Sequence, residues 1–322
     1  MKIENATPFP GMLYRGVIED RRMLGAVFAR VTYDIDGGKL RVAQEQRWKV
    51  SPPPWESEYG PMDSDEVFYR GGVDVFVFGS ARAPGGKPAP RVDVTVEVGT
   101  TFVERLAVFG ERTWVKRRRA LVPDDPEPFT EMPLALANAF GGKDTWDGLE
   151  MPYPDNPDGK GYYIEKDTAL GKPLPNVEDP EQLIENWDDK PEPVGTAATT
   201  IAFGPRLRRG ATFDEKGLMK ALHGCFFNAA FPGMIAPKAV PGDRVRVAGV
   251  RAEGPMEFVL PPVPLRTRVT IGPAVYDRDL VVDQIGIEPD RNAAFIAYRF
   301  PFRYTLIPEE KRRCELLEAK PA

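Results

Sequence analysis

A valine occupies every second position from residue 92 to residue 98, and Asp93, Thr95 and Glu97 separate the valines. Successive side chains of a β-strand point to opposite faces, so this period predicts a strand with one face in the core and one in solvent. The chain also contains 30 glycines and 34 prolines in 322 residues, enough for the frequent turns that short strands require. A mainly β fold is therefore the first expectation.

Other β-prone runs lie toward both ends of the chain. Residues 23–35 form a long one, and the following Asp36-Gly37-Gly38 can turn tightly into a return strand at 39–42. Residues 73–78 are apolar on both faces, as in a covered strand, and Pro84–Pro88 predicts a hairpin-like loop between them and the strand at 92–98. Further strands are expected at 102–109, 112–116, 244–250, 256–260, 265–271, 280–285 and 293–304.

The chain divides into three parts by composition. An N-terminal β region is expected at residues 1–122 and a C-terminal one at 196–322, and the two can form one continuous body. Between them, residues 123–195 are dense in Pro, Gly, Asp and Asn, and loops this long usually fold locally or bind something. We expect antiparallel sheets in a sandwich-like arrangement, long central loops and a few short helices.

Three short helices are predicted. Asp179 can cap the first, at 179–187, and Pro180 suits its first turn. Apolar residues at helical spacing predict the second at 214–223, and a charged amphipathic pattern predicts the third at 308–319.

Charge and hydropathy limit the partners and the compartment. The net charge of −5 gives no reason to expect nucleic acid. No run approaches the roughly 18 consecutive apolar residues that span a bilayer, and the first residues lack the pattern of a secretory signal. Cys225 and Cys314 lie far apart without metal-type spacing. We expect a cytoplasmic protein that needs no membrane, metal or cofactor.

The single histidine, His223, is the first residue to test for catalysis, because a catalytic triad needs one. It lies two positions before Cys225, at the expected end of a helix. Residues two apart on a helix do not face each other, and a histidine at a helix end can cap the last carbonyls. We therefore favour a structural role and predict no catalytic residue.

Acidic residues offer two weaker alternatives. Asn156, Asp158, Gly159 and Glu165 fit part of a calcium-loop pattern, but the first ligand position is Pro154, which has no side-chain oxygen. Acidic clusters could supply the carboxylate pair of a glycan hydrolase, although their separation is not readable from sequence. These clusters are Asp124-Asp125, Asp188-Asp189 and Asp63-Asp65-Glu66.

A basic run, Lys116–Arg119, follows Trp114 at the end of an expected strand. It could bind phosphates or an acidic partner. It could equally keep an edge strand from pairing with other chains, with Asp124 and Asp125 near enough for local neutralisation. We favour the protective role.

Aromatic residues are frequent among the turns of the central segment. On loops they make good binding anchors, because they bury a large area with few rotatable bonds. They can also fold inward as a local core. The candidates for partner binding are Trp146, Tyr153, Tyr162, Tyr163 and Trp187.

Ordered blocks along nearly the whole chain resemble a bacterial family long labelled a domain of unknown function. They include Asn5–Phe9, Thr32–Ile35, Val73–Gly86, Val108–Trp114, Gly204–Arg206 and Ile287–Asp290. The most specific blocks are central and contain Asn138, Phe140, Gly141, Gly142, Asn156, Pro157, Gly159, Lys160, Gly161, Leu174, Pro175, Asn176, Asp179 and Pro180. We expect these residues to shape the scaffold, since glycines and prolines in such blocks more often fix the backbone than touch partners.

Some members of that family act as adaptor/chaperones for type VI secretion effectors. The resemblance therefore implies a non-catalytic protein whose partners are an effector toxin and the spike protein that carries it. The chain departs from the family pattern at residues 225–237, which are unusually apolar, and at Ala202-Phe203, where a tryptophan is expected. The alternatives are a carboxylate-dependent glycan hydrolase and a structural component of a phage-tail-like assembly.

Overall fold

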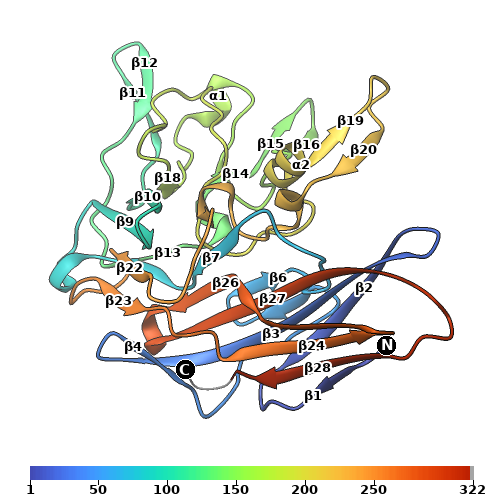
Figure 1. Ribbon diagram of the computed structural model, residues 1–322. Coiled ribbons are helices and arrows are strands. Elements are labelled where there is room, and N and C mark those ends of the chain that lie inside the picture. Colours follow the sequence, from blue (N-terminus) through green and yellow to red (C-terminus); the bar gives the residue numbers. More distant parts are fainter. Residues whose placement is uncertain (320–322) are drawn as a thin grey trace.

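A curled sheet of 12 strands forms the body of the protein in the computed structural model, which describes residues 1–319 (Figure 1). β2 (Gly11–Glu19) pairs with one end of β3 (Arg22–Asp36), beside β4 (Lys39–Val42) on the same edge of β3. The other strands follow in the order β18 (Val177–Glu178), β10 (Phe102–Phe109), β9 (Arg91–Val98), β22 (Arg244–Ala248), β23 (Met256–Val259), β4 (Lys39–Val42), β3 (Arg22–Asp36), β27 (Ala293–Thr305), β26 (Val281–Glu288), β7 (Val73–Val77) and β21 (Ile235–Ala236).

The antiparallel pair β3–β27 forms the spine of this sheet. Its register runs from Ala293 opposite Asp34 to Thr305 opposite Arg22. The sheet therefore combines strands from both ends of the chain, and residues about 260 positions apart in sequence are direct neighbours in space.

A second sheet of four strands covers part of the large one (Figure 1). Leu265, Val269 and Leu316 from this sheet are buried in the same core as Val27 and Val31 of β3. The two layers confirm the sandwich-like, mainly β arrangement. The strands of the second sheet are β1 (Ile3–Asn5), β28 (Arg312–Glu318), β24 (Leu265–Ile271) and β25 (Ala274–Asp279).

Small hairpins and helical turns lie on one side of the large sheet, and several project away from it (Figure 1). The two-stranded units are β5 (Trp55–Ser57) with β6 (Gly60–Met62), β8 (Ser80–Arg82) with β13 (Glu131–Pro133), β11 (Trp114–Arg117) with β12 (Ala120–Pro123), β14 (Phe140–Gly141) with β17 (Lys160–Gly161), β15 (Lys143–Trp146) with β16 (Leu149–Pro152), and β19 (Ala211–Phe213) with β20 (Met219–Leu222). The helices are α1 (Lys166–Ala169) and α2 (Gly204–Gly210), with short 3-10 turns η1 (Pro84–Gly86), η2 (Leu136–Asn138), η3 (Gly224–Phe227), η4 (Pro232–Met234) and η5 (Pro289–Arg291).

The predicted strands are confirmed where the sequence pattern was strongest. β9 alternates as expected, with all four of its valines buried, and all five residues of β7 are buried, which fits a strand covered on both faces. The long strand at 23–35, its return strand at 39–42 and the predicted strands of the C-terminal region also form, with ends shifted by a few residues.

Four local predictions are wrong, three of them because tertiary strand pairing prevails over local pattern. β7 pairs with β26 and β21 while β9 pairs with β10 and β22, so residues 84–88 do not close a hairpin between them. Residues 179–187 make only turns, residues 211–222 form the hairpin β19–β20, and residues 312–318 form β28 between β1 and β24. Short isolated helices are marginal in water, whereas β19, β20 and β28 gain cross-strand hydrogen bonds.

Within residues 1–319, the helices are all too short or too polar to cross a lipid bilayer.

Candidate functional site

The central segment folds around a small hydrophobic core of its own. Trp114, Leu121, Phe140, Tyr163 and Leu174 are buried there together. Two of them, Phe140 and Leu174, belong to the central sequence blocks. The long loop-rich segment is therefore a packed body that projects its hairpins from a stable base, as expected for loops that fold locally.

Gly141 shows why a glycine occurs in these blocks. Its φ is +148°, a conformation that residues with a side chain rarely adopt, and a Cβ there would lie 2.1 Å from the carbonyl oxygen of Asn156. The Asn156 side chain is fully buried and donates hydrogen bonds of 3.0 Å to the carbonyls of Leu136 and Phe140. The amide nitrogen of Asn156 therefore ties its own loop to the η2–β14 segment.

The remaining block residues also contribute mainly to the scaffold. Asn138 donates to the Pro133 carbonyl (2.8 Å) and Asn176 to the Phe109 carbonyl (3.1 Å). Side chains would collide with neighbouring backbone or ring atoms at Gly142, Gly159 and Gly161. Of the others, Pro175 is buried, Pro157 is exposed in a turn, Lys160 pairs with Glu111 (3.3 Å), and Asp179 and Pro180 are half-buried.

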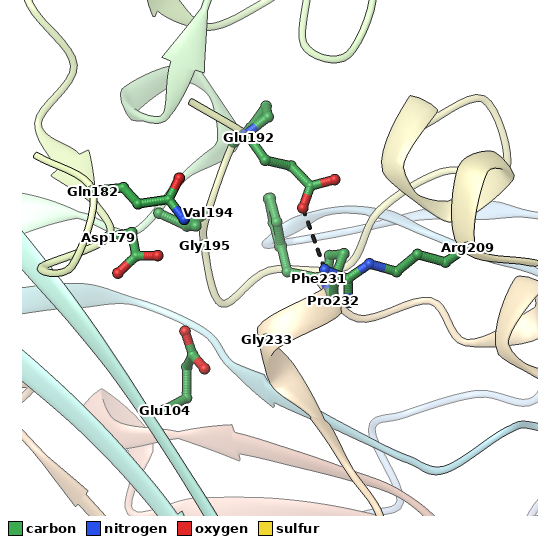
Figure 2. A pocket seen from close by; sticks show the side chains of 11 residues that line it. Glu104, Asp179, Gln182, Glu192, Val194, Gly195, Arg209, Phe231, Pro232 and Gly233 are labelled. Carbon is green, nitrogen blue, oxygen red and sulfur yellow. Dashed lines mark hydrogen bonds and ion pairs between the residues drawn. The ribbon is translucent and has the colours of Figure 1, made fainter. Parts of the chain in front are cut away.

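Asp179 lies at a cavity of about 220 Å³ between the central segment and the large sheet (Figure 2). Figure 2 shows Glu104 of β10 pointing into this cavity, with Asp179 on the opposite wall. Glu192 also lines it and pairs with Arg209 of α2 (3.3 Å). The cavity therefore brings Glu104 of the sheet close to two carboxylates of the central segment, and one of these, Glu192, is neutralised by an arginine.

The electrostatic setting of Glu104 is unusual. Burial, helped by the neighbouring carboxylates of Asp179 and Glu181 and opposed by Arg209, raises the pKa of Glu104 to about 7. A carboxyl group with this pKa can exchange a proton near neutral pH. Sequence reasoning missed Glu104, because in β10 it reads as an ordinary polar position.

A second feature is the apolar surface of two exposed hairpins. In β15–β16, Trp146 lies directly opposite Leu149, and Met151 shares their face of the hairpin. In β19–β20, Phe213 lies opposite Met219. These five side chains are between 39% and 62% exposed, which is high for large apolar residues gathered on short strands. We call this set of five the apolar hairpin surface.

The two hairpins start from one rigid junction. Arg208, near the end of α2, makes two hydrogen bonds to Asp155 (2.6 and 2.7 Å), and Glu192 accepts a third from Arg208 (3.2 Å). Asp155 follows β16, and Arg208 precedes β19 by a few residues. Figure 1 shows both hairpins projecting beside α2 on the same side of the molecule. A bidentate arginine–carboxylate contact of this kind fixes the relative orientation of the two side chains as well as their distance.

The five aromatic candidates divide between core and surface. Tyr163 is buried, and its hydroxyl donates to the Pro173 carbonyl (2.7 Å). Tyr153, Tyr162 and Trp187 pack against the local core and are half-buried. Trp146 alone of the five is more than half exposed, at 52%. We therefore keep only Trp146 in the apolar hairpin surface.

His223 and Cys225 lie where the β19–β20 hairpin meets η3. The backbone N–H of His223 donates to the Gly210 carbonyl (2.7 Å), which continues the hairpin rather than capping a helix. The Cys225 thiol donates to the Arg209 carbonyl (3.1 Å). Both contacts give these residues a structural role at the base of the β19–β20 hairpin.

Sequence reasoning also missed a buried ionic network beneath the sheet surface. Asp74, fully buried in β7, accepts hydrogen bonds from Asn228 (2.9 Å) and Gln284 (3.2 Å) and lies 3.4 Å from Arg70. Burial alone would raise the pKa of Asp283, but Arg299 and Arg70 outweigh that effect and hold the pKa below its ordinary value. A charged residue inside an otherwise apolar strand, such as Asp74 between two valines, was the available signal.

Comparison with known proteins identifies the family. The model of a family described as "uncharacterized protein conserved in bacteria (DUF2169)" matches residues 20–299. No curated protein and no solved structure matches the chain. The match covers most of the chain and confirms the resemblance to a bacterial domain of unknown function. The protein is therefore a member of the bacterial DUF2169 family.

Proposed function

We propose that this protein is a cytoplasmic, non-catalytic adaptor/chaperone that binds a type VI secretion effector toxin and helps to load it onto the spike. The observation that carries the proposal is the apolar hairpin surface. The resemblance of the central sequence blocks to family members with this role supports the choice of partner.

The physical argument starts from the marginal stability of isolated hairpins. A two-stranded hairpin with one exposed apolar face gains stability when another surface covers that face. Trp146 with Leu149 and Phe213 with Met219 are cross-strand pairs, so each hairpin presents a continuous apolar strip. A large aromatic residue flanked by methionine and leucine is typical of binding surfaces that accept a polypeptide.

The junction of Asp155 and Arg208 adds pre-organisation. Because the hairpins are held at their bases, little conformational entropy is lost at the junction when a partner binds. An effector that exposes apolar surface before export would be kept soluble by such a contact. This division between a rigid base and an exposed apolar face suits a chaperone better than an enzyme.

The test is recovery of partners by the tagged protein from the native bacterium under secretion-active conditions, followed by co-expression with the partner identified. We expect a toxin-like polypeptide and a spike component to be recovered. A variant with Trp146→Ala, Leu149→Ser, Phe213→Ser and Met219→Ser should recover about tenfold less effector, because apolar anchors dominate such interfaces. Its melting temperature should stay close to that of the unmodified protein, since these side chains are exposed.

A control variant removes exposed apolar side chains elsewhere. Val275 and Tyr276 lie on β25, at the edge of the small sheet, and are 59% and 36% exposed. Val275→Ser with Tyr276→Ser should leave effector recovery unchanged. Equal recovery by both variants would move the docking site off the hairpins, and recovery of no toxin or spike polypeptide would reject the adaptor proposal.

A second candidate, a carboxylate-dependent glycan hydrolase, is favoured by Glu104 alone. Such enzymes use one carboxylic acid of raised pKa and a second carboxylate, and Glu104 faces Asp179 across the cavity (Figure 2). The cavity of about 220 Å³ is smaller than the roughly 300–1,000 Å³ of most small-molecule sites, so we prefer the adaptor. Release of reducing ends from peptidoglycan or chitin oligosaccharides that Glu104→Gln abolishes would reverse this preference.

A further inference from the structure

The basic run Lys116–Arg119 forms the tip of the hairpin β11–β12. All four side chains are exposed, and Figure 1 shows the hairpin projecting away from the rest of the chain. β12 pairs with β11 and with no other strand of residues 1–319. The run thus lies at the end of a short projection, where a partner can reach it without disturbing the sheets.

The base of this hairpin is firmly packed. Trp114 is 1% exposed in the local core, and Leu121 is buried beside it. Backbone hydrogen bonds join Trp114 to Lys172 (3.0 Å) and to Gly171 (2.8 Å). The tip is therefore presented in a fixed position, which lowers the entropic cost of binding to it.

Three of the four cations form no ion pair within residues 1–319. Arg117 pairs with Asp124 (3.0 Å) and Asp125 (3.3 Å), which confirms local neutralisation for this residue. For Lys116, Arg118 and Arg119, no carboxylate of residues 1–319 lies within the 4.0 Å of an ion pair. In a protein of net charge −5, this tip is a local concentration of positive charge.

The turn holds a long basic side chain in a left-handed backbone conformation. Arg118 has a φ of +59°, and the other non-glycine residues at positive φ within residues 1–319 are aspartates and an asparagine, whose side chains are short and polar. A residue with a side chain costs about 1–2 kcal/mol in this conformation. Keeping the edge strand from pairing with other chains does not require Arg118 at positive φ, because Lys116 and Arg117 already place positive charge on the strand.

We propose that the tip of β11–β12 is a docking site for an acidic segment of another polypeptide. Unpaired guanidinium groups make charge-assisted, paired hydrogen bonds with carboxylates, which fits a run of Asp or Glu. Nucleic-acid sites usually combine more phosphate contacts with exposed aromatic residues, and Trp114 is buried. A membrane surface would favour exposed large apolar side chains, and residues 114–123 contain none.

The experiment uses a fluorescein-labelled oligoglutamate peptide titrated with the full chain at low ionic strength, with fluorescence anisotropy as the readout. We expect saturable binding that weakens as salt is added, because exposed charge pairs are screened. The triple variant Lys116→Gln, Arg118→Gln, Arg119→Gln should bind about tenfold more weakly, since it loses three exposed pairs.

The matched control removes three exposed cations elsewhere, with Lys87→Gln, Arg105→Gln and Lys238→Gln. This variant has the same net charge as the tip variant and should bind the peptide as the unmodified chain does. Equal weakening in both variants would show that net charge alone governs binding and would overturn the proposal. Tip-dependent binding that is tighter to single-stranded DNA or to phosphatidylserine vesicles than to oligoglutamate would overturn it as well.

Arg118→Gly separates a binding role from a structural one. Glycine suits the positive φ, so this variant should melt at a higher temperature while binding oligoglutamate more weakly. Unchanged peptide binding would contradict the proposal. The test does not depend on the adaptor function, because it uses neither the apolar hairpin surface nor an effector, and each can fail alone.

Discussion

Gly141→Ala should destabilise the protein severely, because the new methyl group has no room. A Cβ at this position would lie 2.1 Å from the carbonyl oxygen of Asn156, and the φ of +148° disfavours any side chain. The backbone conformation costs about 1–3 kcal/mol, and forcing apart a packed contact costs about 1–3 kcal/mol more. The free energy of unfolding should therefore fall by about 2–6 kcal/mol.

Gly148→Ala is the matched control for this prediction. Gly148 also has positive φ, +76°, but nothing lies within 4 Å of a Cβ there. Its alanine variant should lose only the conformational term, about 1–2 kcal/mol. Urea unfolding of both variants, followed by tryptophan fluorescence, measures the difference. If Gly141→Ala is no more destabilising than Gly148→Ala, the close packing of Gly141 against Asn156 is not what stabilises the central segment.

Three further results follow from the same structure. Asn156→Ala should lower the free energy of unfolding by about 2 kcal/mol or more, because the carbonyls of Leu136 and Phe140 lose their buried donor; a urea midpoint unchanged from that of the unmodified chain would contradict this. Burial raises the pKa of Cys314 to about 11, so its thiol should react with Ellman's reagent only after unfolding. Reaction of both Cys225 and Cys314 in the folded protein would contradict this prediction. The pKa of Glu104 is about 7 in the folded protein, above its ordinary value of 4.5, so the folded state binds this proton more tightly than the unfolded state does. The free energy of unfolding should therefore fall as pH rises from 4.5 to about 7. Glu104→Gln should flatten that part of the stability profile, and an unaltered profile would mean that Glu104 is not the group responsible.

The strands were predictable because their signals are local. A half-buried strand imposes a period of two on its own residues, and the valines of β9 show it without reference to any partner. The same rule was available at residues 312–318, where Cys314 and Leu316 are buried on one face of β28. The abundant charges there suggested an amphipathic helix instead, and the neighbours β1 and β24 decided the outcome.

The candidate site was predictable only in part. The central blocks include Gly141 and Asn156, which pack against each other, and Trp146 of β15 is exposed, but its partner-binding role stays a prediction. The cavity was not predictable, because Glu104 on β10 is far in sequence from Asp179 and Glu192 of the central segment. The ionic network around Asp74 was missed for the same reason, since its partners are up to 210 positions away in sequence.

By itself, the sequence determined the strand-rich character, the turns and the family, because these depend on side-chain period, backbone conformation and ordered blocks of residues. The tertiary structure decided which strands pair, that β3 lies against β27, and that the hairpins β15–β16 and β19–β20 share one junction at Asp155 and Arg208. Pairing between distant strands depends on loop closure and on the burial of whole faces. No short window of residues contains that information.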